Sequence, residues 1–208
     1  MSHTEAYALP VSNGMKIIGK EKVEARTRAL IAGLGNPGDE YEHTYHNVGM
    51  LAFTYLREKH LSDVQKMKPI KDLFEYAKTS GIAWIKPLVC MNESGKAIAE
   101  AARFFKVEPE EMIIIHDDSD LYIGDFKVSF GLGSAGHKGI ESLIKQLGTK
   151  QFFRVRIGIR PPEENQKHRR KASELVLGNI TPENQKQLFR VFENISGIDP
   201  VSKYLRPR

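Results

Sequence analysis

Three polar residues, Asn36, His46 and Asp117, have the types and spacing that could carry out chemistry. Asn36 and Asp117 each follow an apolar run typical of a buried strand, and the C-terminal ends of strands in an α/β sheet meet at one edge, where sites are built. His46 stands at a loop-to-helix junction shortly after Asn36. From there its imidazole could reach Asp117, whose carboxylate would fix the tautomer and raise the basicity of the ring. This grouping predicts a general base.

Other chemistries have weaker patterns. The segment 33–38 (GLGNPG) fits the GxGxxG spacing of a dinucleotide site, but NPG predicts a turn where that site needs the start of a helix. The sequence has no GxSxG motif for a covalent serine. Cys90 has apolar neighbours and is expected to be a buried structural cysteine. The acidic cluster 116–120 lacks the spacing of a metal motif, so no metal is expected.

Two further histidines, His116 and His137, also stand beside acidic or turn-rich segments. An isolated histidine is more often a packed or capping residue than a catalyst, so neither is assigned a catalytic role. The basic run 167–171 is equally compatible with a solvated loop and with contact to phosphates.

Apolar and periodic segments predict the elements that must position these residues. Strands are expected in 28–35, 74–78, 82–86, 111–118, 125–130 and 152–159, and helices in 47–60, 94–105, 136–147 and after Thr181, which is expected to cap the last helix. Strands that alternate with helices indicate a single three-layer α/β domain, with a twisted, mixed, mostly parallel sheet and helices on both faces. We assign residues 28–208 to this domain and residues 1–27 to an N-terminal extension.

Length and composition agree with one globular domain. The chain has 208 residues, and its single cysteine rules out an internal disulfide framework and fits a reducing compartment. It has neither a secretory signal nor an apolar run of the ~18 residues that would span a bilayer, so a cytoplasmic location without membrane contact is expected. A net charge of +5 is compatible with a polyanionic partner but does not establish one.

Five segments, taken in order, resemble the bacterial-type peptidyl-tRNA hydrolases: GLGNPGDEYEHTYHNVG, MNESGKA, HDDSD, GSAGHKGIESLIKQLGT and FRVRIGI. The resemblance covers about residues 28 to 200. It implies an enzyme that hydrolyses the ester between a peptide and the terminal ribose of tRNA and so recycles stalled peptidyl-tRNA. His46 would activate water and Asp117 would orient His46, without a metal, a cofactor or a covalent intermediate.

The resemblance also implies the residues that bind substrate. Asn36, Tyr41, Met91 and Asn92 would bind the peptidyl end, because side-chain amides can bind a carbonyl or an oxyanion without titrating. The partner would be peptidyl-tRNA, held by its acceptor arm and CCA end, with the protein a monomer. For the tRNA, the corresponding basic residues are Lys127 and Arg156. Backbone N–H groups at the expected helix start 136–139 could add an anion site.

The chain departs from the family pattern at three positions. Tyr45 stands where an arginine is usual, Ser129 replaces a frequent lysine, and Lys138 replaces the asparagine of the GHNG segment. We hypothesise that Lys138 contacts the substrate. Lys138 is also the only support for the alternative that the chain is an inactive, hydrolase-like RNA-binding module.

Overall fold

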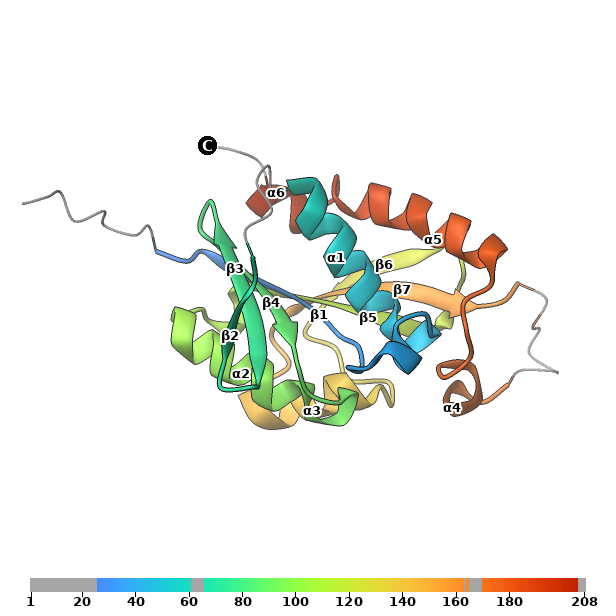
Figure 1. The fold of residues 1–208 in the computed structure, drawn as a ribbon, viewed down its shortest axis with the longest axis horizontal. Helices are drawn as coiled ribbons and strands as arrows, with labels where there is room; N and C mark the ends of the chain where they lie inside the picture. Colours follow the sequence, from blue (N-terminus) through green and yellow to red (C-terminus); the bar gives the residue numbers. More distant parts are fainter. Residues whose placement is uncertain (1–25, 61–65, 163, 165–169, 206–208) are drawn as a thin grey trace, which may run out of the picture.

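One seven-stranded sheet forms the middle layer of the structure (Figure 1). The computed structural model describes residues 26–60, 66–162, 164 and 170–205, so most of the predicted extension lies outside the described residues. The strand order is β2-β3-β4-β1-β5-β7-β6. The strands are β1 (Ala29–Gly33), β2 (Lys68–Ile70), β3 (Phe74–Thr79), β4 (Ile82–Pro87), β5 (Met112–Tyr122), β6 (Phe126–Phe130) and β7 (Phe153–Arg160).

The sheet is mixed and mostly parallel, as predicted. The neighbours β4, β1, β5 and β7 pair in parallel, whereas β3 is antiparallel to β4 and β6 is antiparallel to β7. Strand β2 is antiparallel to β3 and therefore runs in the same direction as the central four. Because most strands point the same way, their C-terminal ends share one edge.

Helices cover both faces of the sheet (Figure 1). On one face lie α1 (Val48–His60), α5 (Pro182–Ile195) and α6 (Val201–Leu205), and on the other lie α2 (Ser94–Phe105) and α3 (Lys138–Leu147). The short helix α4 (Ala172–Leu175) directly follows the basic run 167–171 in the sequence and was not predicted. No helix in the described part of the chain is both long and apolar enough to cross a membrane.

The continuous apolar run in β1 is explained by burial on both faces. All five residues of β1 are buried, and successive side chains point to opposite faces of a strand. Ile31 packs in the core beneath α1 and α5, whereas Leu30 and Ala32 pack in the core beneath α2 and α3. Strand β1 therefore lies at the centre of the domain and contributes side chains to the cores on both faces of the sheet.

Two predictions about the ends of elements have different outcomes. Thr181 caps α5 as predicted, because its hydroxyl accepts a hydrogen bond from the backbone N–H of Asn184 at 3.3 Å, with Pro182 in the first turn. The prediction that Cys90 is buried was wrong. Strand β4 ends at Pro87, and Cys90 is exposed at the start of the next 3₁₀ helix.

At the domain boundary, two residues that the prediction placed in the extension contact the domain. Thr27 is buried, and the guanidinium of Arg26 lies 3.3 Å from the carboxylate of Glu111.

Candidate active site

The candidate site forms where β5 extends past the end of β1. Gly33, the last residue of β1, pairs with Ile115, so Asp117 lies two residues beyond the edge of its neighbour. The 3₁₀ helix η2 (Tyr45–Asn47) carries His46 to the same place, just before α1. A Cβ atom at Gly49 would lie 2.4 Å from the carbonyl oxygen of Ile115, so only glycine lets α1 begin this close to β5.

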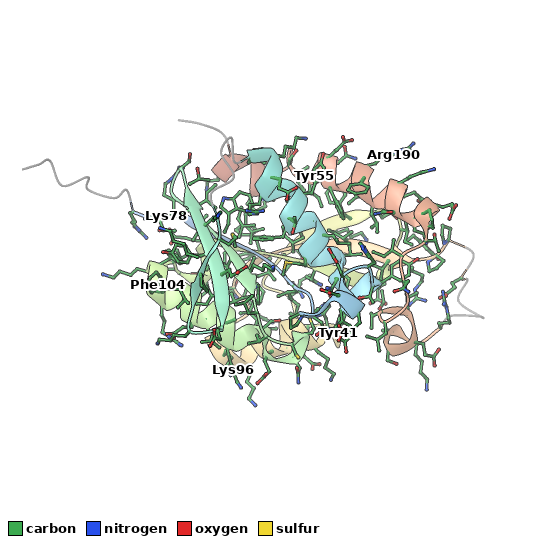
Figure 2. All side chains as sticks on the ribbon, viewed as in Figure 1. Tyr41, Tyr55, Lys78, Lys96, Phe104 and Arg190 are labelled. Carbon is green, nitrogen blue, oxygen red and sulfur yellow. The ribbon has the colours of Figure 1, made fainter. Side chains whose placement is uncertain are left out.

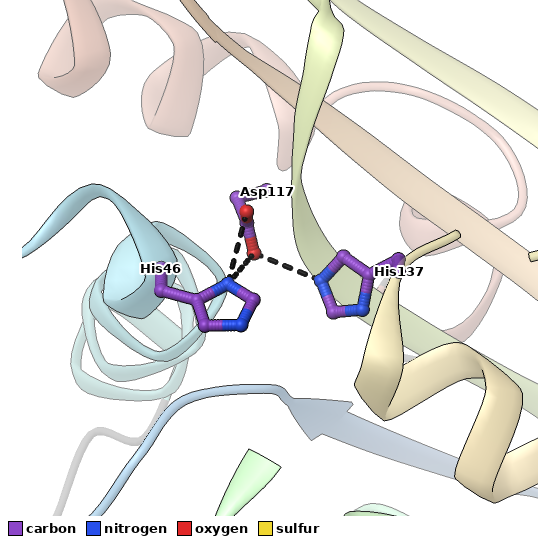
Figure 3. Close-up of side chains that lie close together, drawn as sticks. All are labelled: His46, Asp117 and His137. Atoms are coloured by element: carbon purple, nitrogen blue, oxygen red, sulfur yellow. Dashed lines mark hydrogen bonds and ion pairs between the residues drawn. The ribbon is translucent and has the colours of Figure 1, made fainter. Parts of the chain in front are cut away.

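The structure brings His46 and Asp117 together as predicted. Nδ1 of His46 lies 3.0 and 3.1 Å from the two carboxylate oxygens of Asp117 (Figure 3). An ionised carboxylate can only accept, so Nδ1 carries the proton and donates it. This leaves Nε2 as the unprotonated nitrogen, and Figure 3 shows it on the side of the ring turned away from Asp117.

His137 is a third member of the site that the sequence interpretation missed. Its Nε2 lies 2.9 Å from Oδ1 of Asp117 (Figure 3). Its Nδ1 caps α3 and accepts from the backbone N–H groups of Gly139 at 3.1 Å and Ile140 at 3.4 Å. Because Nδ1 accepts, the proton must be on Nε2, which donates to Asp117. The signal in the sequence was a histidine in the first turn of the predicted helix 136–147, whereas the structure starts this helix at Lys138 and makes His137 its N-cap.

Asp117 is a buried anion held by two imidazoles. Its side chain is 2% exposed. Burial opposes ionisation, but attraction to His137 and hydrogen bonds from His137 and His46 outweigh it and hold the pKa of Asp117 well below the usual range of aspartate. The adjacent His116 is also buried, and this burial lowers the pKa of its imidazole well below the usual value. Its Nδ1 donates to the backbone carbonyl of Asp117 at 2.6 Å, so the backbone of Asp117 is held as well as its side chain.

Among the described residues, His46, Asp117 and His137 each offer one metal-ligand atom, all within 4.8 Å of one another. A neutral imidazole that binds a metal through Nε2 must be protonated on Nδ1. In His137, however, Nδ1 faces two backbone N–H donors. The cap of α3 therefore disfavours a metal at this place and favours the hydrogen-bonded arrangement.

Asn36 is fixed by a second asparagine. The backbone N–H of Asn36 donates to Oδ1 of Asn47 at 2.8 Å, and Nδ2 of Asn47 donates to the carbonyl of Asn36 at 2.9 Å. Oδ1 of Asn36 accepts from the backbone N–H of Met91 at 2.8 Å. Within the described part of the chain, Nδ2 of Asn36 has no hydrogen-bond partner, so it remains available as a donor. The buried Asn47 was not predicted, although it directly follows His46.

The other predicted substrate residues lie around this edge in different environments. Tyr41 is half-buried in the 3₁₀ helix η1 (Asp39–Tyr41), and Asn92 is exposed in η3 (Met91–Glu93). Met91 is buried and packs against Gly139 at the start of α3. Lys138 is exposed and pairs with Glu141 at 3.1 Å.

The two predicted tRNA-binding residues are direct neighbours across β6 and β7, where Lys127 pairs with Arg156. Lys127 is exposed, but Nε of Arg156 donates to Oδ2 of Asp118 at 2.6 Å. Most of the basic run 167–171 lies outside the described residues.

The glycine-rich turn does not have the geometry of a dinucleotide site. Gly38 has a φ of 108°, and the chain continues into the three-residue helix η1 rather than into an α-helix. The prediction of a turn at Asn36–Gly38 is therefore confirmed. A cavity of about 650 Å³ opens beside it, lined in part by Asn36, Asn47 and Phe189, but His46 and Asp117 do not line it.

Comparisons with known proteins agree with this geometry. A family model described as Peptidyl-tRNA hydrolase matches residues 30–201. A peptidyl-tRNA hydrolase of Lactobacillus gasseri is 40% identical over 80% of this chain and 89% of the relative, and one of Caldicellulosiruptor saccharolyticus is 37% identical over 85% and 95%. The crystal structure of the peptidyl-tRNA hydrolase from Acinetobacter baumannii superposes with a TM-score of 0.72 at 27% identity, covering 86% of this chain and 89% of that one. The chain belongs to the peptidyl-tRNA hydrolase family.

Proposed function

We propose that this chain hydrolyses the ester bond between a peptide and the terminal ribose of tRNA, with His46 as the general base. The observation that carries the proposal is the hydrogen bond between His46 and Asp117, which leaves Nε2 of His46 free to accept a proton. Family membership supplies the substrate class.

In the proposed reaction, Nε2 of His46 takes a proton from water as the water oxygen attacks the ester carbonyl. The resulting tetrahedral intermediate collapses, the ester C–O bond breaks, and the ribose oxygen leaves with the proton that His46 had taken. The products are a peptide carboxylic acid, which loses its proton to the solvent, and a tRNA hydroxyl. Asp117 stabilises the imidazolium that forms in between, because its buried carboxylate lies against Nδ1–H of His46.

Amide donors are proposed to hold the ester carbonyl and its developing negative charge. The hydrogen bond from the N–H of Met91 to Oδ1 of Asn36 directs Nδ2 of Asn36 away from the backbone, and Asn92 is exposed next to Met91. Such donors stabilise an oxyanion without changing charge. Tyr41 and Met91 are proposed to line the same end of the site. Lys138 is proposed to leave its ion pair with Glu141 and to contact the substrate instead.

For the tRNA, we propose that Lys127 contacts a phosphate of the acceptor arm while the CCA end reaches His46. Its exposed position on β6 supports this role. Arg156 is held by Asp118 and is proposed to contribute to the positive field beside Lys127. Phosphate contacts position a substrate without reading its sequence, which suits an enzyme that accepts many tRNAs.

The test is release of a labelled N-acetyl-aminoacyl group from tRNA by the full chain in EDTA. Turnover supports the proposal. Salt-sensitive binding of tRNA without turnover would favour the inactive RNA-binding alternative, which the comparisons above do not support. A cytoplasmic location and a monomeric state stay predictions.

A further inference from the structure

A groove of about 1160 Å³ lies at the opposite edge of the sheet from the candidate active site. It is lined by Arg26 and Thr27, which precede β1, and by Ser80 and Gly81, which precede β4. It therefore lies where the parallel strands begin, whereas His46 and Asp117 lie where they end. Figure 2 shows Lys78 and Phe104 of this groove at one end of the molecule, well away from Tyr41 at the active-site edge.

The charged side chains that line the described part of the groove are all positive. Its described lining includes the cations Arg26, Lys66, Lys68, Lys78 and Lys106, and no carboxylate. Arg26 is paired with Glu111 outside the lining. Lys68 and Lys106 are exposed, and no ion pair among the described residues includes either of them. Clustered cations of this kind favour a polyanion.

Strand register places part of this charge beside an aromatic ring. Lys68 of β2 pairs directly with Tyr76 of β3, and paired residues share one face of a sheet. Lys78 lies two residues after Tyr76 and therefore projects from the same face. The sheet thus places two lysines on the same face as the ring of Tyr76, one on the neighbouring strand and one on the same strand.

The end of α2 adds two more rings. The centroids of Tyr76 and Phe105 are 5.1 Å apart, and those of Phe104 and Phe105 are 4.9 Å apart. Phe105 packs into the core, but Phe104 is 54% exposed. Lys106 follows directly in the left-handed region, with a φ of 54°, and it ends the helix at the groove. The result is an open aromatic surface flanked by lysines.

We infer that this groove is a second RNA-binding site, in which an unpaired base stacks on Phe104 while Lys68 and Lys106 bind flanking phosphates. Base stacking on aromatic rings combined with a basic groove is the physical basis of single-strand binding. Because the site is remote from His46, the inference is independent of whether the chain hydrolyses its substrate. The RNA is either another part of the substrate tRNA or a separate molecule.

The experiment measures fluorescence anisotropy of a labelled eight-nucleotide RNA of mixed sequence. Phe104→Ala is expected to weaken binding about tenfold by removing the stacking surface. Lys68→Gln/Lys106→Asn should weaken binding and lower the slope of log affinity against log salt by about 1.4, for two phosphates of a single strand. Arg190→Glu, which changes the net charge by the same two units on α5, is the matched control and should bind as the wild type does.

Equal binding by the wild type, Phe104→Ala and the double variant would overturn the inference, and so would the absence of any measurable binding. Competition by polyglutamate as strong as by RNA, with no effect of Phe104→Ala, would also overturn it by showing a general anion site. A second arm separates the two sources of RNA. If the groove holds the substrate tRNA, the variants raise KM for full-length N-acetyl-aminoacyl-tRNA but not for an acceptor minihelix; if it holds another RNA, neither KM changes.

Discussion

Nε2 of His137 lies 2.9 Å from Oδ1 of Asp117, the same oxygen that lies 3.0 Å from Nδ1 of His46. The buried carboxylate is therefore shared by two imidazoles whose proton positions are both determined by their partners. One imidazole faces the proposed substrate, and the other begins a helix. This relationship connects the stability of α3 to the orientation of the proposed base.

Asp117→Asn removes the negative charge of this side chain but keeps its shape, so it tests whether the charge matters for catalysis. The amide keeps one acceptor but places an NH₂ donor against His46 or His137, both of which donate to the native carboxylate. We expect kcat for N-acetyl-aminoacyl-tRNA to fall at least about 10²-fold. Asp125→Asn, at an exposed turn, is the control. If kcat of Asp117→Asn stayed within threefold of the wild type, Asp117 would have no role in orienting His46.

His137 is predicted to be a positioning residue as well as a helix cap. His137→Ala should lower the free energy of unfolding by about 1 kcal/mol because α3 loses its N-cap. His137→Asn should restore most of this stability, since asparagine is a good N-cap residue, yet its shorter side chain no longer reaches Asp117. Urea unfolding and kcat of both variants test this. Recovery of activity together with stability in His137→Asn would show that the histidine is only a cap.

Burial of His116 predicts a loss of stability in mild acid. Its pKa is lowered well below the usual 6.5, so as the pH falls below 6.5 the unfolded chain gains a proton that the native state does not. The stability contributed at neutral pH is thus lost as the pH falls. Asp117, whose pKa is also lowered, contributes a loss only at still lower pH, below its usual value of 3.8.

The measurement is urea unfolding of the wild type and His116→Asn at pH 7 and pH 5. The variant should be less stable at pH 7. Its free energy of unfolding should, however, fall less between pH 7 and pH 5 than that of the wild type, by about 2 kcal/mol, because the variant lacks the one proton that unfolded His116 gains over the 1.5 pH units below 6.5. Equal losses in the two proteins would mean that His116 gains its proton in the native state too.

Lys127 and Arg156 are predicted to respond differently to alanine substitution although they are paired across two strands. Lys127→Ala should raise KM for the tRNA substrate, leave kcat unchanged and lower the salt slope of binding by about 1. Arg156→Ala leaves the buried Asp118 without its ion-pair partner and should lower the free energy of unfolding by about 3 kcal/mol. Lys145→Ala on α3 is the control for Lys127. An unchanged KM and salt slope for Lys127→Ala would exclude the proposed phosphate contact.

The sequence predicted the layers and the His46–Asp117 pair because these depend on local signals. An apolar run such as that of β1 identifies a buried strand, and strand ends identify the edge at which polar residues meet. The sequence did not predict β2, which has three residues including Pro69, or α6, which has five. Such short elements form through contacts with the rest of the domain rather than through their own pattern.

The parts of the site that were missed depend on tertiary contacts. His137 serves Asp117 only because α3 starts beside β5, and Asn47 serves Asn36 only because η2 folds back on the turn after β1. Cys90 was expected to be buried from its apolar neighbours, but the chain has already left the sheet at Pro87. The types of the residues next to Cys90 do not indicate that the chain leaves the sheet before it.

Hydrolysis by His46→Ala tests the central claim most directly. The wild type, His46→Ala and His43→Ala are compared for release of an N-acetyl-aminoacyl group from tRNA in EDTA, with thermal unfolding as a check on folding. His43 is an exposed histidine three residues earlier and serves as the control. Our account predicts wild-type and His43→Ala turnover that survives EDTA, and a fall of about 10²- to 10⁴-fold in folded His46→Ala. Turnover by His46→Ala at the wild-type rate, or loss of wild-type turnover in EDTA, would contradict it.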